Sequence, residues 1–560
     1  MVNWKSKKLG DLLLLANGLM VIILLNLLAS VTFFRFDLTE EKRFSIKEPT
    51  REILRQLDDD VHIEVYLEGE LNASFRRFQK SIRETLEEFR IYSGQKIKYT
   101  FVDPATALSQ KAQSEFMAEL AAKGVQPTNV VDKKDGQRIE KIIFPGAVVS
   151  YGGSEVGVML LKGNKARTPE EEINQSIEGV EYELASAINK LSNLDRKQIG
   201  FVYGHGELDS LEVASFNNAL LEVYDVFKVN LSTSDLKTYD ALIIAKPTTP
   251  FTPQERYYLD QYIMRGGKVL MLIDRVNASM ESASDAGNLA LPVDVQLDDQ
   301  LFKYGVRLNV DLVQDRSSSL YPVVTGQSGG RPKMQLIEWP FFPVINRYAD
   351  HPTTRNLDAV VAKFVSSIDT VKATGVKKTP LLFTSQYSRT LTAPVSVSIQ
   401  NLRQDVDPKN FTKSFIPVAY LLEGKFTSAF KNRFLPPGVD SAGYQQESAP
   451  AKIIVVADGD LARNDINPRT RQPLALGFDP FTNTTFANQD LIMNMLAFLT
   501  DEGGLIAVRN KEVKIRPLDK EKIVAEKTKW QVINLAIPLV LLITYGILRN
   551  LLRKRRYASF

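Results

Sequence analysis

The 560-residue sequence contains no cysteine and only three histidines. The absence of cysteine excludes disulfide bonds, thiol nucleophiles, zinc sites that use cysteine, and lipid attachment to cysteine. His62, His205 and His351 are too few and too scattered to suggest a histidine cluster. The nucleotide-binding pattern G-x-x-x-x-G-K-[ST] is also absent. If the protein takes part in ATP-driven work, another subunit therefore hydrolyses the ATP, and we expect neither a cofactor nor a metal in this chain.

A strong excess of charge is lacking as well. The formal net charge is +4, from 70 Lys and Arg against 66 Asp and Glu. For a chain of this length, that balance does not favour a nucleic acid as partner. The length allows two or three domains with cores of their own.

Two uncharged segments, one near each end, predict transmembrane helices. Residues 12–34 contain no charged side chain and would be about 34 Å long as a helix. A cleaved signal peptide is the alternative, because Lys5, Lys7 and Lys8 resemble its basic start. However, the apolar run is longer than a signal core, and no A-x-A site follows it. The sequence therefore favours an uncleaved anchor, preceded by a basic segment at 1–11.

The second predicted span, 531–552, is followed by a basic tail at 553–560. Because positively charged residues stay on the cytoplasmic side, the pattern places both termini in the cytoplasm. The bulk of the chain would then be periplasmic, and the protein would be anchored in a bacterial inner membrane. The basic residues of the tail are Arg553, Lys554, Arg555 and Arg556.

The first periplasmic domain is predicted over 37–165. Val61–Leu67 alternates as a half-buried strand, Phe75–Ile91 is apolar on one helical face, and Lys96–Asp103 predicts the next strand. This β-α-β unit indicates a thioredoxin-like or α+β domain, which cannot be a redox domain without cysteine. Two hairpins should follow, with turns near 132–136 and 152–153, and then a bridging helix at 168–192.

A second periplasmic domain, 196–505, is predicted to be a doubly wound α/β domain. Its short apolar runs alternate with helices, and Thr252 can cap the helix that begins at Pro253. A large insertion near 293–450 is rich in proline and glycine, so we expect loops there, with strands at Leu381–Val397 and Ile416–Glu423. A membrane-proximal segment, 506–530, completes the ectodomain. The apolar runs are Ile199–Tyr203, Ala241–Ala245, Lys268–Ile273 and Lys452–Ala457.

The candidate functional face lies where these strands end. In doubly wound sheets, ligands and partners meet the loops at the carboxyl ends of the strands. Here those loops are Gly204–Asp209, Lys246–Phe251 and Asp274–Asn277. We expect binding residues, and no catalytic ones, among Gly204, His205, Gly206, Glu207, Asp209, Asp274, Asp458 and Asp460.

Gly204–Asp209 has several interpretations. The dinucleotide pattern G-x-G-x-x-G lacks its third glycine, because Asp209 occupies that position, and an acidic loop repels pyrophosphate. His205 and Glu207 could form an acid-base or metal pair. We favour a turn that needs glycine backbone angles, with His205 hydrogen-bonded beneath a partner surface.

Two further motifs are weaker. Residues 326–330 match G-x-S-x-G, but Arg331-Pro332 follows where a nucleophile elbow needs a helix, so we expect a loop. Asp458-Gly459-Asp460, together with Asp465, could hold a cation. A calcium loop would need a late bidentate glutamate, and a polar turn at a strand end is the favoured interpretation.

The chain resembles the gliding-motility-associated ABC-transporter substrate-binding family (the GldG type) over nearly its full length. The resemblance implies an inner-membrane subunit that works with a separate permease and a separate ATPase. It also implies an auxiliary domain similar to class I glutamine amidotransferases without their catalytic cysteine, and hence binding or assembly. The motifs that carry it, in order, are RFDLTEEKRFSI, FVDP at 101–104, IIFPGAVVSYGG at 142–153, FVYGHGEL at 201–208, VAYLLEGKFTSAF at 418–430 and VVADGDLARND at 455–465.

Three hypotheses follow. The leading one is a non-enzymatic accessory subunit with a permease, an ATPase and periplasmic motility or secretion components as partners. The second is a metal- or carboxylate-dependent hydrolase of envelope polymers that uses His205, Glu207 and Asp209. The third is a structural envelope linker.

Overall fold

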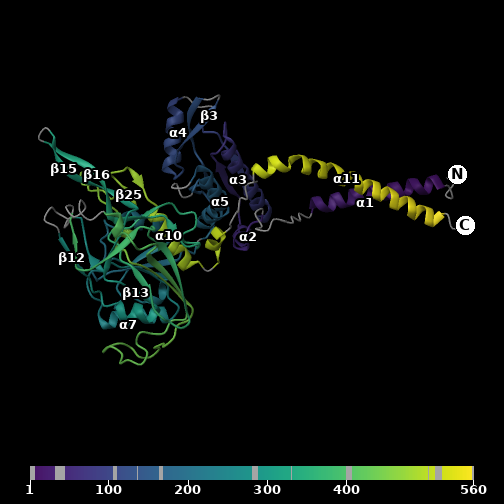
Figure 1. The fold of residues 1–560 in the computed structure, drawn as a ribbon. Helices are drawn as coiled ribbons and strands as arrows, with labels where there is room; N and C mark the ends of the chain where they lie inside the picture. The colour runs from purple at the N-terminus through teal and green to yellow at the C-terminus, as the bar shows by residue number, and fades with distance from the viewer. Residues whose placement is uncertain are drawn as a thin grey trace. The chain divides into compact units, whose positions relative to one another are not determined.

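The computed structural model is a mixed α/β protein with several sheets (Figure 1). It divides into two units, Met1–Lys511 and Glu512–Phe560. The first unit carries every sheet of the described chain, and the second contains one long helix. The structure describes residues 7–31, 45–104, 110–134, 137–162, 168–193, 195–280, 288–328, 331–398, 407–501, 503–510 and 520–557.

The predicted β-α-β unit near the N-terminus is confirmed. β1 and β2 are parallel, with Val61 opposite Ile97, and α3 connects them. The side chains of β1 alternate between buried and exposed, as the sequence pattern requires. Asn72 caps α3 by accepting a hydrogen bond from Phe75 N. The elements are α2 (Glu48–Arg55), β1 (Val61–Val65), α3 (Ala73–Tyr92), β2 (Ile97–Phe101) and α4 (Gln110–Ala122).

Both predicted hairpins are also present, although residues 135–136 of the first turn lie outside the described chain. The four-stranded sheet has the order β2-β1-β5-β6, with β5 antiparallel to β1. This arrangement is compatible with the thioredoxin-like interpretation, which stays a prediction. A helix follows where the bridge was expected. The elements are β3 (Thr128–Lys134), β4 (Gln137–Ile143), β5 (Gly146–Tyr151), β6 (Ser154–Met159) and α5 (Pro169–Ser192).

The largest sheet has eight strands in the order β17-β20-β23-β24-β10-β9-β7-β8. Its last five strands are parallel, and the predicted pairing of the 452–457 segment into the same parallel sheet is confirmed. The other three are antiparallel. The strands are β17 (Arg347–Tyr348), β20 (Val376–Phe383), β23 (Pro417–Gly424), β24 (Ala451–Val456), β10 (Val269–Leu272), β9 (Ala241–Ala245), β7 (Gln198–Val202) and β8 (Asp225–Val229).

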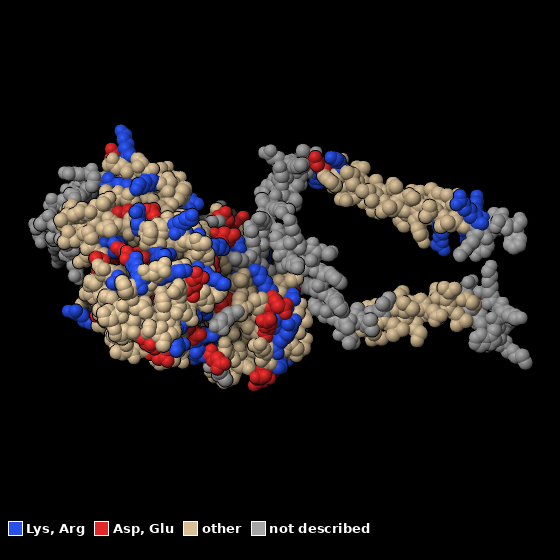
Figure 2. All heavy atoms as spheres, turned by 90° about the horizontal axis from the view of Figure 1, so that it is seen from below, with Lys and Arg blue, Asp and Glu red and all other residues tan. Residues whose placement is uncertain are grey.

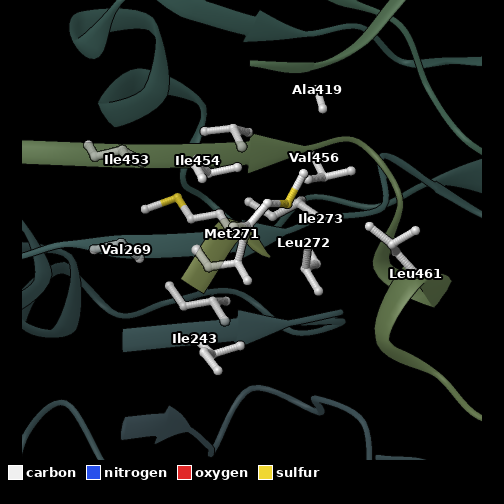
Figure 3. Packing of buried hydrophobic residues seen from close by; sticks show 14 of the residues in the cluster. Ile243, Val269, Met271, Leu272, Ile273, Ala419, Ile453, Ile454, Val456 and Leu461 are labelled. Atoms are coloured by element: carbon white, nitrogen blue, oxygen red, sulfur yellow. The ribbon is translucent and has the colours of Figure 1, made fainter. Parts of the chain in front are cut away.

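β10 lies in the middle of this sheet and is buried along its whole length. Figure 3 shows its side chains packed against those of the neighbouring strands, with Ile243 on one side and Ile453 and Ile454 on the other. Because both faces of such a strand are covered, its sequence is a continuous apolar run. Burial of each large side chain contributes about 1.5–3 kcal/mol. β8, which sequence analysis missed, is a half-exposed edge strand that carries Asp225 and Lys228.

Helices connect the parallel strands. Thr252 caps α7 as predicted: its hydroxyl accepts from Glu255 N, while the Glu255 carboxylate accepts from Thr252 N. Another of these helices, α8, ends at Gly305, which has a φ of +114°. The helices are α6 (Ala214–Leu221), α7 (Pro253–Met264), α8 (Asp298–Tyr304) and α10 (Asn488–Thr500).

Two predictions within 293–450 are wrong, one of loops and one of a single strand. Residues 318–345 form a long hairpin, β15 (Ser318–Ser328) and β16 (Arg331–Ile345), that includes four prolines (Figure 1). The strand expected at Leu381–Val397 is instead the end of β20 followed by β21 and β22. Residues 326–328 of the G-x-S-x-G motif therefore belong to β15, and its last two glycines lie outside the described residues.

Proline has no N–H to donate, but it fits a two-stranded ribbon wherever its nitrogen faces away from the partner strand. The number of prolines in this segment therefore does not indicate loops. The remaining short elements are β11 (Val276–Asn277), β12 (Asn288–Pro292), β13 (Val306–Leu308), β14 (Asp311–Asp315), β18 (Val360–Val361), β19 (Ile368–Thr370), β21 (Ser388–Thr392), β22 (Val395–Val397), β25 (Phe478–Asp479), β26 (Thr484–Thr485), η1 (Leu236–Thr238), η2 (Pro408–Asn410), η3 (Gly459–Ala462) and η4 (Leu505–Asn510).

Each predicted membrane segment is helical where it is described. Within α11 (Lys520–Tyr557), residues Glu526–Arg555 are long and apolar enough to cross a membrane. Within α1 (Lys7–Val31), the described apolar stretch, Leu13–Leu24, is shorter than a span, and 32–34 lie outside the described residues. The two helices indicate membrane anchoring.

The basic residues predicted to flank the spans are only partly described. Lys5 lies outside the described chain, and Lys7, Lys8 and Arg556 are placed by their backbone alone. Arg553, Lys554 and Arg555 are exposed at the end of α11. Figure 2 shows that α11 has charged residues near both ends and an uncharged middle.

Candidate functional site

Four strand-end loops meet at one edge of the eight-stranded sheet. They follow β7, β9, β10 and β24, and hydrogen bonds connect them in pairs. Thr248 N donates to His205 O at 2.8 Å, which joins the first two loops. Gly459 N donates to Asp274 Oδ1 at 2.5 Å, which joins the last two. The structure thus brings all the predicted site residues to this edge, as parallel strands require.

His205 is fixed between two glutamates. Its Nδ1 lies 3.0 Å from Glu207 Oε1, and its Nε2 lies 3.2 Å from Glu255 Oε2. The second contact is an ion pair without the geometry of a well-directed hydrogen bond. The imidazole stacks on Phe251, with 3.7 Å between ring centroids, and the residue is only 3% exposed. Each ring nitrogen therefore lies close to a carboxylate oxygen, and the ring is shielded from solvent.

The neighbouring carboxylates stabilise the protonated form of the histidine. Burial lowers the pKa of His205, but the carboxylates of Glu207 and Glu255 outweigh it, so the net pKa is raised above its ordinary value. Burial likewise raises the pKa of Glu255, whereas its bonds to Thr252 and His205 lower it, and the net pKa is lowered. The cluster is a compact ion-paired unit.

The turn itself needs its glycines. Gly204 and Gly206 have φ values of +120° and +68°. A Cβ on Gly206 would lie 2.1 Å from Thr248 Oγ1. Asp209 closes the turn, because its Oδ1 accepts from Leu211 N and from the N–H of the next residue, at 2.8 Å each. The structure therefore has the glycine-dependent turn that sequence analysis favoured.

Lys246 organises the second half of the site. Its ammonium lies 2.6 Å from Asp460 Oδ1 and 3.1 Å from Asp274 Oδ2. Asp458 binds backbone N–H groups: its Oδ1 accepts from Asp460 N and its Oδ2 from Lys363 N, at 2.9 Å each. We call Lys246, Asp274, Asp458 and Asp460 the lysine–aspartate cluster.

Burial sets the protonation of this cluster. It raises the pKa of Asp274 to about 6, and Lys246 offsets only part of that effect. It also raises the pKa of Asp458, with further contributions from Asp274 and Asp460. For Lys246, burial lowers the pKa, but the two aspartates prevail and raise it above the ordinary value. The lysine remains charged and neutralises its neighbours.

The sequence allowed a bound cation beside these aspartates, but lysine side chains of the chain itself supply positive charge there. Asp465 pairs with Lys363, whose Nζ lies 3.2 Å from both carboxylate oxygens. Among the residues that the structure describes, no group of three or more His, Asp or Glu is arranged to hold a metal ion. Sequence analysis missed Lys246 as a site residue, although its place directly after β9 was a sufficient signal.

An open cavity of about 550 Å³ adjoins the cluster. Its walls include five aromatic side chains besides that of Phe478, and one end is charged. That end is internally paired: Arg463 lies 2.8 Å from Glu212 and 3.5 Å from Asp460, and Lys363 is held by Asp465. The volume is typical of small-molecule sites. We call this the aromatic cavity, after Tyr321, Phe342, Phe364, Phe481 and Phe486.

The aromatic cavity was not foreseen from the sequence. Tyr321 and Phe342 come from the β15–β16 hairpin, and Phe481 and Phe486 from the turns after Gly477. Phe481 is 48% exposed, so the cavity opens to solvent. Because its charges pair with one another, it suits a largely apolar ligand or protruding side chain.

Two family models match the chain. Residues 196–495 match a model described as an ABC-type uncharacterized transport system, and residues 40–150 match a domain of unknown function. The first match covers more than half of the chain and includes every residue of the lysine–aspartate cluster. Neither description refers to gliding motility.

Similar proteins are distant. An uncharacterized protein of Borreliella burgdorferi (strain ATCC 35210 / DSM 4680 / CIP 102532 / B31) is 21% identical over 567 residues, which cover 98% of this chain and 99% of the relative. Among solved structures, the mmIFT52 N-terminal domain matches 54% of this chain and 97% of its own, at 13% identity and a TM-score of 0.31. That likeness is too weak to bear on the fold.

Proposed function

Because the chain belongs to the family described as an ABC-type uncharacterized transport system, we propose that it is a non-catalytic, membrane-anchored auxiliary subunit of such a transporter. In this proposal a separate permease and a separate ATPase complete the complex. Both predicted spans cross the bacterial inner membrane, both termini are cytoplasmic, and the sheets lie in the periplasm. The GldG-type resemblance adds an association with gliding motility or protein secretion.

The burial of His205 is the main support for a non-catalytic role. A general base must reach the proton that it removes. His205 is 3% exposed and has a carboxylate at each ring nitrogen. Lys246 is held in the same way by Asp274 and Asp460. These groups stabilise a rigid sheet edge, and the aromatic cavity beside them remains open to a partner or ligand.

Purification of the full-length protein in mild detergent tests the transporter proposal. We expect a permease and an ATPase to copurify in a fixed ratio, identified by mass spectrometry. Recovery of the protein alone, or with envelope proteins only, would refute the proposal in favour of the envelope linker.

A double substitution, His205→Ala with Glu207→Ala, addresses the hydrolase alternative. A hydrolase acting on envelope polymers would lose all turnover while remaining folded. A docking subunit has no turnover to lose, so the variant should affect only stability and complex formation. His62→Ala is the matched control, because His62 is exposed on β1.

A further inference from the structure

A second cavity lies at the antiparallel side of the same sheet edge. β20 is antiparallel to β23, which is antiparallel to β24, so β20 ends at the edge where β24 ends. The cavity measures about 480 Å³ and is formed by turns that flank β14, β17, β20 and β23. We call it the arginine cavity; its lining includes Arg316, Glu338, Arg347, Gln386, Tyr387 and Phe415.

Within the described chain, its arginines have no carboxylate partner. Arg316 and Arg347 are exposed, and neither forms an ion pair within the described residues. Glu338 also lines the cavity without forming an ion pair there, which leaves an excess of one positive charge. Lone arginines are common on protein surfaces, so exposure alone does not make a site. Here, however, both side chains border one cavity whose loops are rigidly held.

A buried carboxylate fixes two of these loops. Asp315 is 0% exposed and accepts from Ser385 N and Ser385 Oγ at 2.6 Å each, and from Ser317 N at 2.8 Å. Arg316 N donates to Tyr387 O at 3.1 Å in the same network. The backbone beside Arg316 is therefore fixed before any ligand arrives, which reduces the entropy lost on binding.

Phe415 is held in a strained conformation at the rim. Its φ is +54°, which is unusual for an aromatic residue, and its N–H donates to Ser385 O at 2.9 Å. Phe415 is 48% exposed and Tyr387 is 52% exposed. Two open aromatic rings thus border the arginines.

We propose that the arginine cavity binds a small ligand in which a carboxylate or phosphate is attached to an apolar or aromatic group. The planar guanidinium fork matches the paired oxygens of such an anion. The rings of Tyr387 and Phe415 would contact the apolar part, and the volume lies in the range of small-molecule sites. This site is separate from the aromatic cavity and does not depend on the transporter role.

Calorimetric titration of the full-length protein in detergent tests this site. The probes are phenyl phosphate and phenylacetate, with inorganic phosphate and benzyl alcohol as partial ligands. We expect either aromatic anion to bind more tightly than both partial ligands, and added salt to weaken its binding. The relative affinity of phenyl phosphate and phenylacetate identifies the preferred anion.

Substitutions locate the binding. Arg316→Gln and Arg347→Gln should each weaken the aromatic anions at least tenfold, because each removes a charged donor. Tyr387→Ala should weaken phenyl phosphate but not inorganic phosphate. Arg76→Gln is the matched control, since Arg76 is exposed on α3 and does not line the cavity.

Several outcomes would overturn the assignment. They are no binding of any probe, unchanged affinity in both arginine variants, benzyl alcohol binding as tightly as the anions, or inorganic phosphate binding as tightly as phenyl phosphate. Thermal unfolding of each variant checks that it is folded. If a glutamine variant unfolds, the corresponding lysine substitution keeps the charge and should retain part of the affinity.

Discussion

The two sides of one sheet edge differ in whether their positively charged side chains are paired with carboxylates. On the parallel side, Lys246 lies between Asp274 and Asp460, and its side chain is only 17% exposed. On the antiparallel side, Arg316 and Arg347 are exposed and have no carboxylate partner in the described chain. A positive charge thus stabilises the fold on the parallel side, whereas on the antiparallel side it can contact a ligand.

Solvent access explains the difference. Removing a charge from water costs several kcal/mol, and only a close partner of opposite sign offsets that cost. An exposed guanidinium keeps its water and needs no partner, so it can exchange water for a ligand. Burial, rather than residue type, therefore separates charges that hold the fold together from charges that can bind.

The largest effect expected is that of Lys246→Met. This change leaves Asp274 buried without its counter-charge and leaves Asp460 with only the longer contact to Arg463, and breaking a buried ion pair typically costs about 3–5 kcal/mol. Arg316→Gln on the other side should change stability by less than about 0.5 kcal/mol. Urea unfolding of both variants measures the contrast, and equal losses would show that burial does not distinguish the two sides.

A smaller, pH-dependent effect is expected for Asp274→Asn. The pKa of Asp274 is raised from 3.8 to about 6, so the folded protein holds this proton more tightly than the unfolded chain. Its contribution to stability must therefore fall as the pH rises through that window. Relative to the wild type, Asp274→Asn should become more stable between pH 4 and pH 7, by on the order of 1–3 kcal/mol.

Urea unfolding at a series of pH values provides the measurement for Asp274. A stability difference between variant and wild type that stays constant from pH 4 to pH 7 would contradict the raised pKa. Asp369→Asn is a suitable control, because Asp369 pairs with Arg307 at an exposed position.

The smallest effect expected is that of His205→Gln. The substitution removes a charge between Glu207 and Glu255 and should destabilise the protein by about 1–2 kcal/mol at pH 6. Because the pKa of His205 is raised above 6.5, its stabilisation is complete below that pH and is lost as the pH rises through the folded-state pKa.

Thermal unfolding at pH 6 and pH 9 tests the His205 prediction. The difference between wild type and variant should be larger at pH 6. A difference that does not depend on pH would mean that the imidazole stabilises the turn by stacking on Phe251 alone.

Local patterns accounted for much of the fold. The alternation of Val61–Leu67, the apolar run at Lys268–Ile273 and the Thr252–Pro253 helix start each depend on nearest neighbours, and each has its expected structure. The face that carries Asp274 and Asp458 followed from one rule, that parallel strands end at the same edge.

Long-range packing accounted for the rest. Tyr321 and Phe481 both line the aromatic cavity, and Arg316 and Arg347 both line the arginine cavity. These residues are distant in the sequence, and their segments are rich in turns or proline, where periodicity gives no signal. Even β8 was missed, because an edge strand keeps its charged residues.

The sequence by itself determined the strongly periodic elements, the two uncharged segments and the edge at which the strand-end loops meet, because these depend on short-range periodicity and on uncharged length. Only the tertiary structure decided which charges on that edge are paired and which are free. Pairing depends on distances of a few ångströms between residues such as Lys246 and Asp460, which are 214 positions apart. No local pattern encodes such a distance. Burial then determines whether a charge stabilises the fold or can bind a ligand.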